Sequence, residues 1–226
     1  MDSETSLNRY LTALVKARPG DARARPPARP FLTISRESGA GAVTVGQRVV
    51  EILNHEPQDV PWTLFDRSLV DVVLEKYDLP QELSKYLTED AVNTFESFVD
   101  DMFGLHPPAH SLVRKTNETI IALAKLGKTI LVGRGGNFLT RKLEGGFHVR
   151  LVASRESRLR HYQEYFDLSD KEAAERLKSA DESRKNYVSD VFGRDVDDLL
   201  SYDYVVNTTW ISYDTAARII AAPLLG

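Results

Sequence analysis

The chain has 226 residues, of which 42% are hydrophobic and 27% are charged, and its formal net charge is −4. This balance excludes a mostly disordered chain and a collagen-like chain, and we expect no specific binding to nucleic acid. No apolar run approaches the roughly 18 residues that a membrane-spanning helix needs, so no membrane partner is expected. The chain contains no cysteine, which excludes disulfides and zinc–thiolate sites. That absence fits a reducing compartment, and we expect a cytoplasmic protein.

The first 30 residues differ in composition from the rest of the chain. They carry six basic and three acidic side chains, which leaves them positively charged while the remainder is negative. Apolar residues at helical spacing predict an amphipathic helix over Ser3–Lys16: Leu7, Leu11, Leu14 and Val15. Residues 17–30 hold four prolines and four arginines, which predicts an extended arm. We expect residues 1–30 to pack loosely or to meet a partner chain. In the second case, the arm would join copies of the chain in a homo-oligomer.

From residue 31 onward, strand and helix patterns alternate. Five short apolar segments predict β-strands: Phe31–Ser35, Trp62–Phe65, Thr129–Val132, Phe147–Val152 and Tyr204–Val206. Helical periodicity occupies the intervals, at Val43–Asn54, Leu69–Tyr77, Leu112–Leu126, Ser154–Phe166, Ser169–Phe192 and Tyr213–Leu225. Strands that are apolar throughout indicate a sheet covered on both faces, and the alternation predicts an α/β fold with a parallel sheet. Ligands of such sheets bind beyond the carboxyl ends of the strands.

Residues 31–226 are therefore expected to form the main domain. Within it, residues 78–110 are acidic, carry an apolar stripe and predict a helical insertion. The two tryptophans, Trp62 and Trp210, are interpreted as packing residues rather than as stacking platforms.

The strongest local signal follows the first strand, in the segment from Ile34 to Gly46, ISRESGAGAVTVG. A strand, a glycine-rich turn and a helix start are what a phosphate-binding loop needs, because glycines let the backbone approach an anion and the helix end offers free amides. The pattern GxxxxGK[ST] is only partly met. The candidate phosphate-binding residues are Ser38, Gly39, Ala40, Gly41, Ala42, Val43 and Thr44. The alternative is a tight turn that binds nothing.

Three positions of this loop depart from that pattern. Arg36 stands where the first glycine is expected, Ala42 where the lysine is expected, and Val43 where the metal-binding hydroxyl is expected. An anion nest of backbone amides survives these changes, but the lysine charge does not. Arg36 can supply that charge by binding phosphate, or it can pair with Glu37.

Four sequence segments, in this order along the chain, can be compared with a known family: ISRESGAGAVTVGQRV, FDRSLV, ILVGRGGNFL and FHVRLVASRESRLRH. Together they resemble the cytidylate kinase-like family, a branch of the nucleoside monophosphate kinases among P-loop NTPases. The resemblance covers about residues 31–220. It implies a three-layer α/β/α fold with a five-stranded parallel sheet, ATP and Mg²⁺ on the glycine-rich loop, a monophosphate in a neighbouring small domain, and an arginine-bearing lid, here residues 154–192.

The resemblance also implies roles for residues outside the loop. Phosphoryl oxygens would meet Arg36, Arg134, Arg158 and Arg184, and the adenine would meet Asn207 and Thr208. The monophosphate would meet Asp66, Arg67, Gly135, Gly136 and Asn137. Each arginine can instead lie on a solvated or ion-paired helix face, and Asp66 can cap the next helix. Gly135 replaces an acid of active relatives, and no metal-ligating residue is assigned.

Two functions follow from these features. The first is ATP-dependent phosphorylation of a nucleoside monophosphate such as CMP or dCMP, or of a different acceptor. The second is a nucleotide-binding or regulatory module that keeps the fold and a degenerate loop but has lost fast catalysis, so whether the chain is an active enzyme stays open. Both functions require the turn from Ser38 to Thr44 to present its amides to a polyphosphate. Side chains that plug that turn would argue against both.

Overall fold

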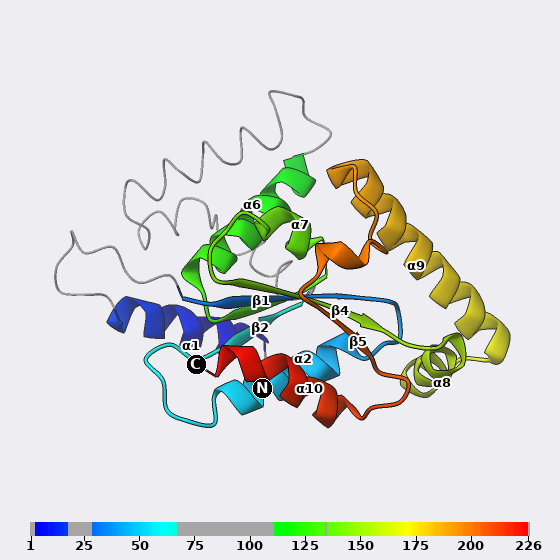
Figure 1. Cartoon of the computed structure of the whole chain (residues 1–226), viewed down its shortest axis with the longest axis horizontal. Coiled ribbons are helices and arrows are strands. Elements are labelled where there is room, and N and C mark those ends of the chain that lie inside the picture. The colour runs from blue at the N-terminus through cyan, green and yellow to red at the C-terminus, as the bar shows by residue number, and fades with distance from the viewer. Residues whose placement is uncertain (1–2, 18–28, 67–110, 134, 226) are drawn as a thin grey trace.

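The computed structural model describes residues 3–17, 29–66, 111–133 and 135–225 (Figure 1). Within these residues one sheet of parallel strands has the order β2-β3-β1-β4-β5. The strands are β1 (Phe31–Arg36), β2 (Thr63–Phe65), β3 (Thr129–Val132), β4 (Gly146–Val152) and β5 (Tyr204–Asn207). This confirms the expected α/β fold with a five-stranded parallel sheet.

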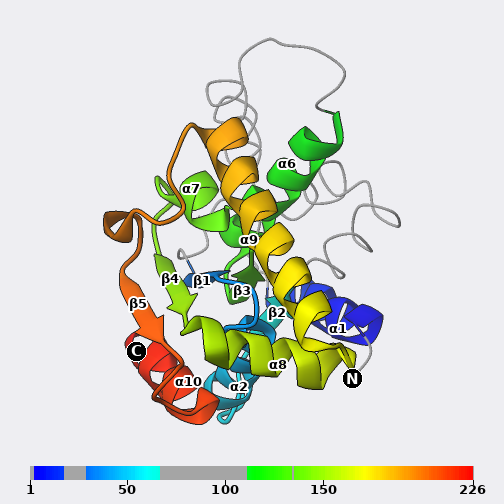
Figure 2. The ribbon, with the colours of Figure 1, turned by 90° about the vertical axis from the view of Figure 1, so that its right-hand side faces the viewer.

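Helices cover both faces of the sheet (Figures 1 and 2). On one face α2 (Ala42–Leu53) and α10 (Tyr213–Ala221) pack on a core centred on Leu32 and Ile34. On the other face α1 (Ser3–Lys16), α6 (Ser111–Leu126) and α7 (Gly136–Thr140) pack around Phe31 and Leu131. The remaining described helices are α8 (Arg155–Phe166), α9 (Asp170–Phe192) and short 3₁₀ turns at Leu199–Ser201 and Ala222–Leu224. The expected helix at 69–77 and the insertion at 78–110 lie outside the described residues.

Side-chain caps and glycines set the ends of the two helices that follow β4. Ser154 caps α8 by accepting a hydrogen bond from the Ser157 amide, and Ser169 with Glu172 forms a capping box at the start of α9. Gly193, at φ 60°, ends α9 in the left-handed conformation that glycine adopts without cost. The sequence therefore encodes both boundaries of this helix pair.

Helix α1 lies where the sequence predicts it, but it is part of the core rather than a loosely packed arm. Leu7, Tyr10 and Leu14 are buried. The Tyr10 hydroxyl donates a hydrogen bond of 2.6 Å to the Gly127 carbonyl, and its ring meets that of Phe65 edge-on at 5.7 Å. The apolar stripe of α1 covers sheet surface beside β2 that would otherwise face water. The division of the chain at residue 30 stays a prediction.

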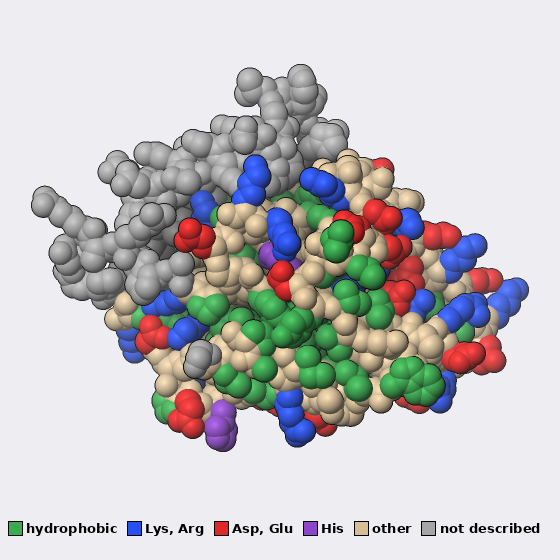
Figure 3. All heavy atoms as spheres, in the orientation of Figure 1, with side chains coloured by type: hydrophobic (Ala, Val, Ile, Leu, Met, Phe, Trp, Pro, Cys, Tyr) green, Lys and Arg blue, Asp and Glu red, His purple; other side chains and the backbone are tan. Residues whose placement is uncertain are grey.

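Strand β5 departs from the expectation that every apolar strand is covered on both faces. It is an edge strand, and of its four residues only Val206 is buried. Tyr204 and Val205 keep about 40% of their surface exposed. Figure 3 shows hydrophobic side chains gathered on the face where β5 and α10 lie. An apolar run therefore identified the strand but not its position at the edge.

A buried histidine on β4 gives the fold a measurable pH dependence. His148 is 2% exposed, and its Nδ1 lies 2.9 Å from the Thr33 hydroxyl. Burial lowers the pKa of His148 to about 4. An unfolded histidine takes up its proton near pH 6.5, so this contribution to stability is complete above that pH and is lost as the pH falls toward 4. We expect the free energy of unfolding to fall by about 2 kcal/mol more than it would without His148 between pH 7 and pH 4.5.

Urea unfolding of the wild type and His148→Gln at both pH values checks this prediction. The variant should lose the extra pH dependence, whatever its own stability at pH 7. The exposed His55, changed to Gln, serves as the control and should keep the wild-type slope. Equal slopes for the wild type and His148→Gln would contradict the expectation.

Candidate functional site

The turn between β1 and α2 has the backbone shape that the sequence predicts. Gly39 and Gly41 have φ of 80° and 82°, a conformation that other residues rarely adopt. A Cβ atom on Gly41 would lie 2.6 Å from Cε1 of the Tyr213 ring, so this position has no room for a side chain. Gly41 also immediately precedes α2, and no side chain caps that helix. The amino end of α2 is therefore left to other partners.

Most amides of the loop are not engaged by the protein. The Ala40 amide donates to the Glu37 carbonyl at 3.2 Å, and the Ser38 amide donates to Oδ1 of Asp181 at 2.8 Å. Within the part of the chain that the structure describes, the amides of Gly39 and of residues 41–44 have no hydrogen-bond partner. Such a run of free amides at a helix start is an anion-binding arrangement. Most amides of the turn are thus free, although Asp181 occupies the Ser38 amide and the turn is covered by Arg158 at Gly39 and by the Tyr213 ring at Gly41.

Two arginines that the sequence resemblance assigns to a lid, Arg158 and Arg184, converge on Ser38. Arg158, on α8, donates from Nη1 to the Ser38 carbonyl at 3.3 Å and to Oδ2 of Asp181 at 2.5 Å. Arg184, on α9, donates from Nη1 to the Ser38 hydroxyl and lies 3.4 Å from Oδ1 of Asp181. The structure therefore brings Arg158 and Arg184 together beside the loop, although their sequence positions alone do not require it.

Glu37 fixes the start of α8 against the loop. Its Oε2 accepts a hydrogen bond from the Ala153 amide at 2.9 Å and lies 3.5 Å from Nε of Arg158. Arg36 is the residue that could supply the charge of the missing lysine. Its guanidinium group lies against Gly133, just after β3, where an added Cβ atom would collide with Nη1. Both side chains therefore lie at the carboxyl edge of the sheet.

Sequence reasoning missed one arginine of this region, Arg150. It lies on β4, is 4% exposed, and donates to the Ser35 hydroxyl at 3.2 Å and to Oδ1 of Asp197 at 2.6 Å. The signal was a charged residue inside the strand FHVRLV, which was expected to be buried on both faces. Burial is the main cause that lowers the pKa of Arg184, and the positive charges of Arg150 and Arg158 lower it further while Asp181 opposes them. The three guanidinium groups therefore act on one another.

The loop after β3 is built for close packing. Gly135 has φ of 68°, and a Cβ atom there would lie 3.1 Å from Cδ2 of the Phe192 ring. A side chain at position 135 would therefore collide with the Phe192 ring. Gly136 packs on Thr33, and the buried Asn137 donates to the Ser201 carbonyl at 3.4 Å. Arg134 and Arg67 lie outside the described residues, and Asp66 directly follows β2.

The loop after β5 contacts the turn between β1 and α2. The Thr208 hydroxyl donates to the Ala40 carbonyl at 3.1 Å, and Thr208 is buried. The Asn207 side chain accepts a hydrogen bond from the Thr209 amide at 2.9 Å. Trp210 follows with 86% of its surface exposed, so the interpretation of it as a packing residue is wrong, whereas Trp62 is 3% exposed and does pack. The hydrogen bonds of Thr208 and Thr209 hold the turn before Trp210, which leaves its ring in solvent.

The described residues suit a polyphosphate better than they suit a bare metal ion. The loop has free amides and arginines lie beside it, and both are donors that suit phosphate oxygens. Among the described residues no three His, Asp or Glu side chains gather in a way that would hold a metal. Val43 offers no hydroxyl, and Thr44 stands one position later.

None of the described helices is long and apolar enough to cross a membrane.

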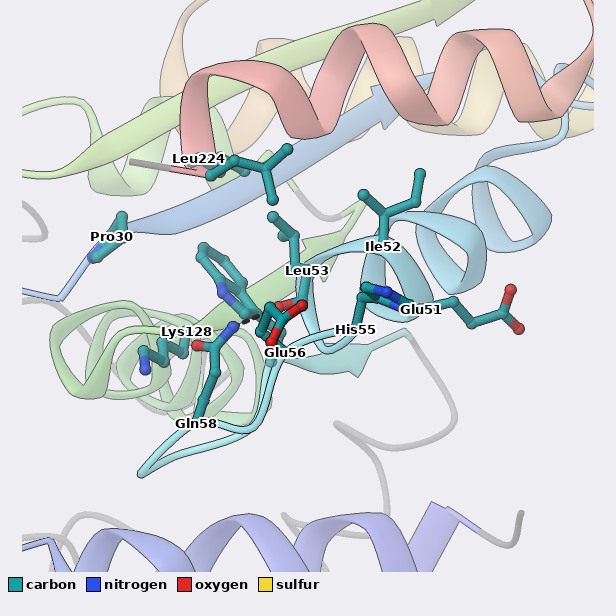
Figure 4. A pocket seen from close by; sticks show the side chains of 11 residues that line it. Pro30, Glu51, Ile52, Leu53, His55, Glu56, Gln58, Lys128 and Leu224 are labelled. Carbon is teal, nitrogen blue, oxygen red and sulfur yellow. Dashed lines mark hydrogen bonds between the residues drawn. The ribbon is translucent and has the colours of Figure 1, made fainter.

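A cavity of about 730 Å³ lies at the opposite edge of the sheet (Figure 4). Pro30, Trp62 and Lys128 line it, and each directly precedes a strand. The carboxyl ends of the strands, where ligands of parallel sheets bind, therefore point away from this cavity. Its lining includes neither the 38–44 loop nor the arginines beside that loop. We therefore place the candidate site at the loop, where the free amides and guanidinium groups lie, and not in this cavity.

A model of the Cytidylate kinase-like family matches residues 31–210. The chain belongs to this family. The match takes in the loop, the sheet and helices α8 and α9, and it confirms the resemblance drawn from the sequence motifs. A search of curated proteins gave no match.

Three solved structures are similar to this chain to different degrees. An uncharacterized protein from Eubacterium ventriosum is 16% identical with a TM-score of 0.58, over 87% of this chain and 98% of that chain. A shikimate kinase from Acinetobacter baumannii, in complex with shikimate, is 14% identical with a TM-score of 0.47, over 87% and 93% of the two chains. One from Bacteroides thetaiotaomicron is 15% identical with a TM-score of 0.46, over 86% and 98%. The likeness to the first of these proteins supports the fold alone.

Proposed function

We propose that this protein binds ATP on the 38–44 loop and transfers its terminal phosphoryl group to a nucleoside monophosphate, CMP or dCMP in the first instance. The observation that carries the proposal is the run of free amides at the start of α2 with Arg158 and Arg184 beside it. Amides would hold the bridging phosphates, and guanidinium groups would neutralise the transferring one. Membership of the Cytidylate kinase-like family supports the same assignment.

The chemistry asks little of this protein beyond positioning and positive charge. The bond between the terminal phosphorus of ATP and its bridging oxygen breaks, and a phosphate oxygen of the acceptor forms the new bond. That acceptor oxygen is already ionised, so no general base is needed. A magnesium ion would be held mainly by phosphate oxygens and water, as is usual for this cation in phosphoryl-transfer sites. Arg36, Arg158 and Arg184 would then supply the charge that Ala42 does not.

A second candidate is a nucleotide-binding module without fast transfer. Two observations favour it: Ala42 replaces the lysine, and Gly135 leaves no space for the acid of active relatives. Removing a single transition-state donor costs about 10²–10³ in turnover. The module would keep the amides and the fold but would lack most of the catalytic charge.

Coupled measurement of ADP release with CMP, dCMP, UMP and AMP tests the proposal, beside calorimetric titration of ATP with Mg²⁺. We expect turnover with a pyrimidine monophosphate and about a 10²–10³-fold loss of turnover in Arg184→Ala, the effect of losing one charged donor. Arg176→Ala, an exposed arginine of the same helix, is the matched control and should keep wild-type turnover. Binding without turnover would favour the module, and a protein that binds no nucleotide would contradict both candidates.

A further inference from the structure

The Ser38 amide of the loop is occupied by an anion that belongs to the protein, the Asp181 carboxylate. Oδ1 of Asp181 accepts the Ser38 amide at 2.8 Å, and its Oδ2 accepts Nη1 of Arg158 at 2.5 Å. Arg184 lies 3.4 Å from Oδ1 of the same carboxylate. A backbone amide and two guanidinium groups around one pair of oxygens are the donors that the proposed function assigns to phosphate.

We propose that Asp181 is an internal substitute for phosphate, so that α9 holds the loop closed until an incoming polyphosphate displaces it. This inference rests on the proposed function and adds a regulatory step to the same site. Two anions cannot share these donors, because like charges a few ångströms apart repel strongly in a site partly shielded from water. Binding of the nucleotide and the contact made by Asp181 therefore exclude each other.

The packing around the contact gives the same conclusion on steric grounds. Ser38 is 2% exposed and Ala40 is fully buried, so the loop is covered in this arrangement. A Cβ atom on Gly39 would lie 2.8 Å from the Arg158 carbonyl oxygen, which places the backbone of α8 directly against the turn. A polyphosphate reaches Ser38 only when the α8–α9 pair moves away.

The helix pair is lightly held, which makes such a movement inexpensive. Of the 23 residues of α9 only Ala173, Leu177 and Val188 are buried, and α8 buries none of its side chains. Figure 2 looks onto α8 and α9, with the strands of the sheet behind them. Elements with few buried apolar contacts open at low free energy. The charged contact at Asp181 is then a substantial part of what keeps the pair closed.

Calorimetric titration of ATP with Mg²⁺, and separately of inorganic tripolyphosphate, tests the proposal on the wild type, Asp181→Asn and Asp181→Ala. If the closed arrangement makes up about 90% of the free protein, both variants bind each ligand about tenfold more tightly than the wild type. Glu182→Gln is the matched control, because Glu182 is an exposed neighbour that pairs with Lys178 at 3.8 Å rather than with the loop, and its affinity should not change. Affinity that is unchanged or weaker in both Asp181 variants, beside a wild type that binds, overturns the internal substitute.

The amide resonance of Ser38 in the nucleotide-free protein gives a readout that needs no ligand. Asp181→Asn should shift that resonance and speed its hydrogen exchange, whereas Glu182→Gln should do neither. A Ser38 amide that ignores Asp181→Asn overturns the contact itself. If Ser38 responds but neither ligand binds the wild type or the variants, the proposed function fails and the gating role fails with it. That outcome is distinct from a wild type that binds without any gain in the variants.

Discussion

Replacing Gly41 with valine is expected to weaken ATP binding about a hundredfold, which corresponds to roughly 3 kcal/mol. The left-handed backbone at Gly41, φ 82°, costs about 1–2 kcal/mol for a residue with a Cβ atom, and more for a β-branched one. The added Cβ would also meet the Tyr213 ring, whose hydroxyl oxygen would lie at 2.7 Å. The turn must then shift, and the amides at the start of α2 lose the orientation that a phosphate requires.

Gly193 supplies the matched control for this experiment. It also has a left-handed backbone, φ 60°, but a Cβ atom added there would have no other atom within 4 Å. Gly193→Val should therefore lower stability through backbone strain while leaving ATP affinity unchanged. Calorimetric titration of both variants, with unfolding curves to show that each is folded, separates the two effects. Equal ATP affinity for Gly41→Val and the wild type would contradict the placement of phosphate at this turn.

Changing Arg158 to alanine is expected to lower turnover about 10²–10³-fold and stability by about 2 kcal/mol. The Arg158 side chain is 12% exposed, and besides Ser38 and Asp181 it contacts the Ala153 carbonyl at 3.2 Å and Glu37 at 3.5 Å. Its loss removes positive charge at the loop and leaves two carboxylates without this partner. Single-turnover kinetics and urea unfolding measure the two effects.

Two further variants show whether the charge or the geometry of Arg158 matters. Arg158→Lys keeps the charge but loses the planar fork, so it should recover stability more fully than turnover. Arg160→Ala, exposed on the same helix, should leave both unchanged. Turnover within twofold of the wild type in a folded Arg158→Ala protein would rule out a part for Arg158 in transfer.

The sheet and most helices of this protein could be predicted because their signals are local. Strand β3 and helix α1 lie at the expected residues, and the other strands differ from expectation by one residue at an end. Helix α7 was not predicted, because five residues starting at a glycine are too few to show periodicity. The burial of α1 and the exposure of β5 depend on which elements end up as neighbours, and residue patterns within one segment carry no such information.

The candidate site was predicted in part for the same reason. The loop could be located because glycines between a strand and a helix leave a local trace, and Arg158 and Arg184 could be named from the family's motifs. The contact between Asp181 and the Ser38 amide could not, because it joins residues 143 positions apart and competes with the ligand that the loop predicts. The exposure of Trp210 likewise follows from the contacts of Thr208 and Thr209, which no sequence pattern reports.

The most direct test of nucleotide binding is to map the backbone amides of the full chain by nuclear magnetic resonance while ATP with Mg²⁺ is titrated. We predict that the largest shifts fall on Gly39 and residues 41–44, and that the Ser38 amide changes as the Asp181 carboxylate leaves it. Shifts that gather instead around Trp62 and Leu224, at the cavity on the opposite edge, or no shifts at millimolar ATP, would contradict nucleotide binding at this loop.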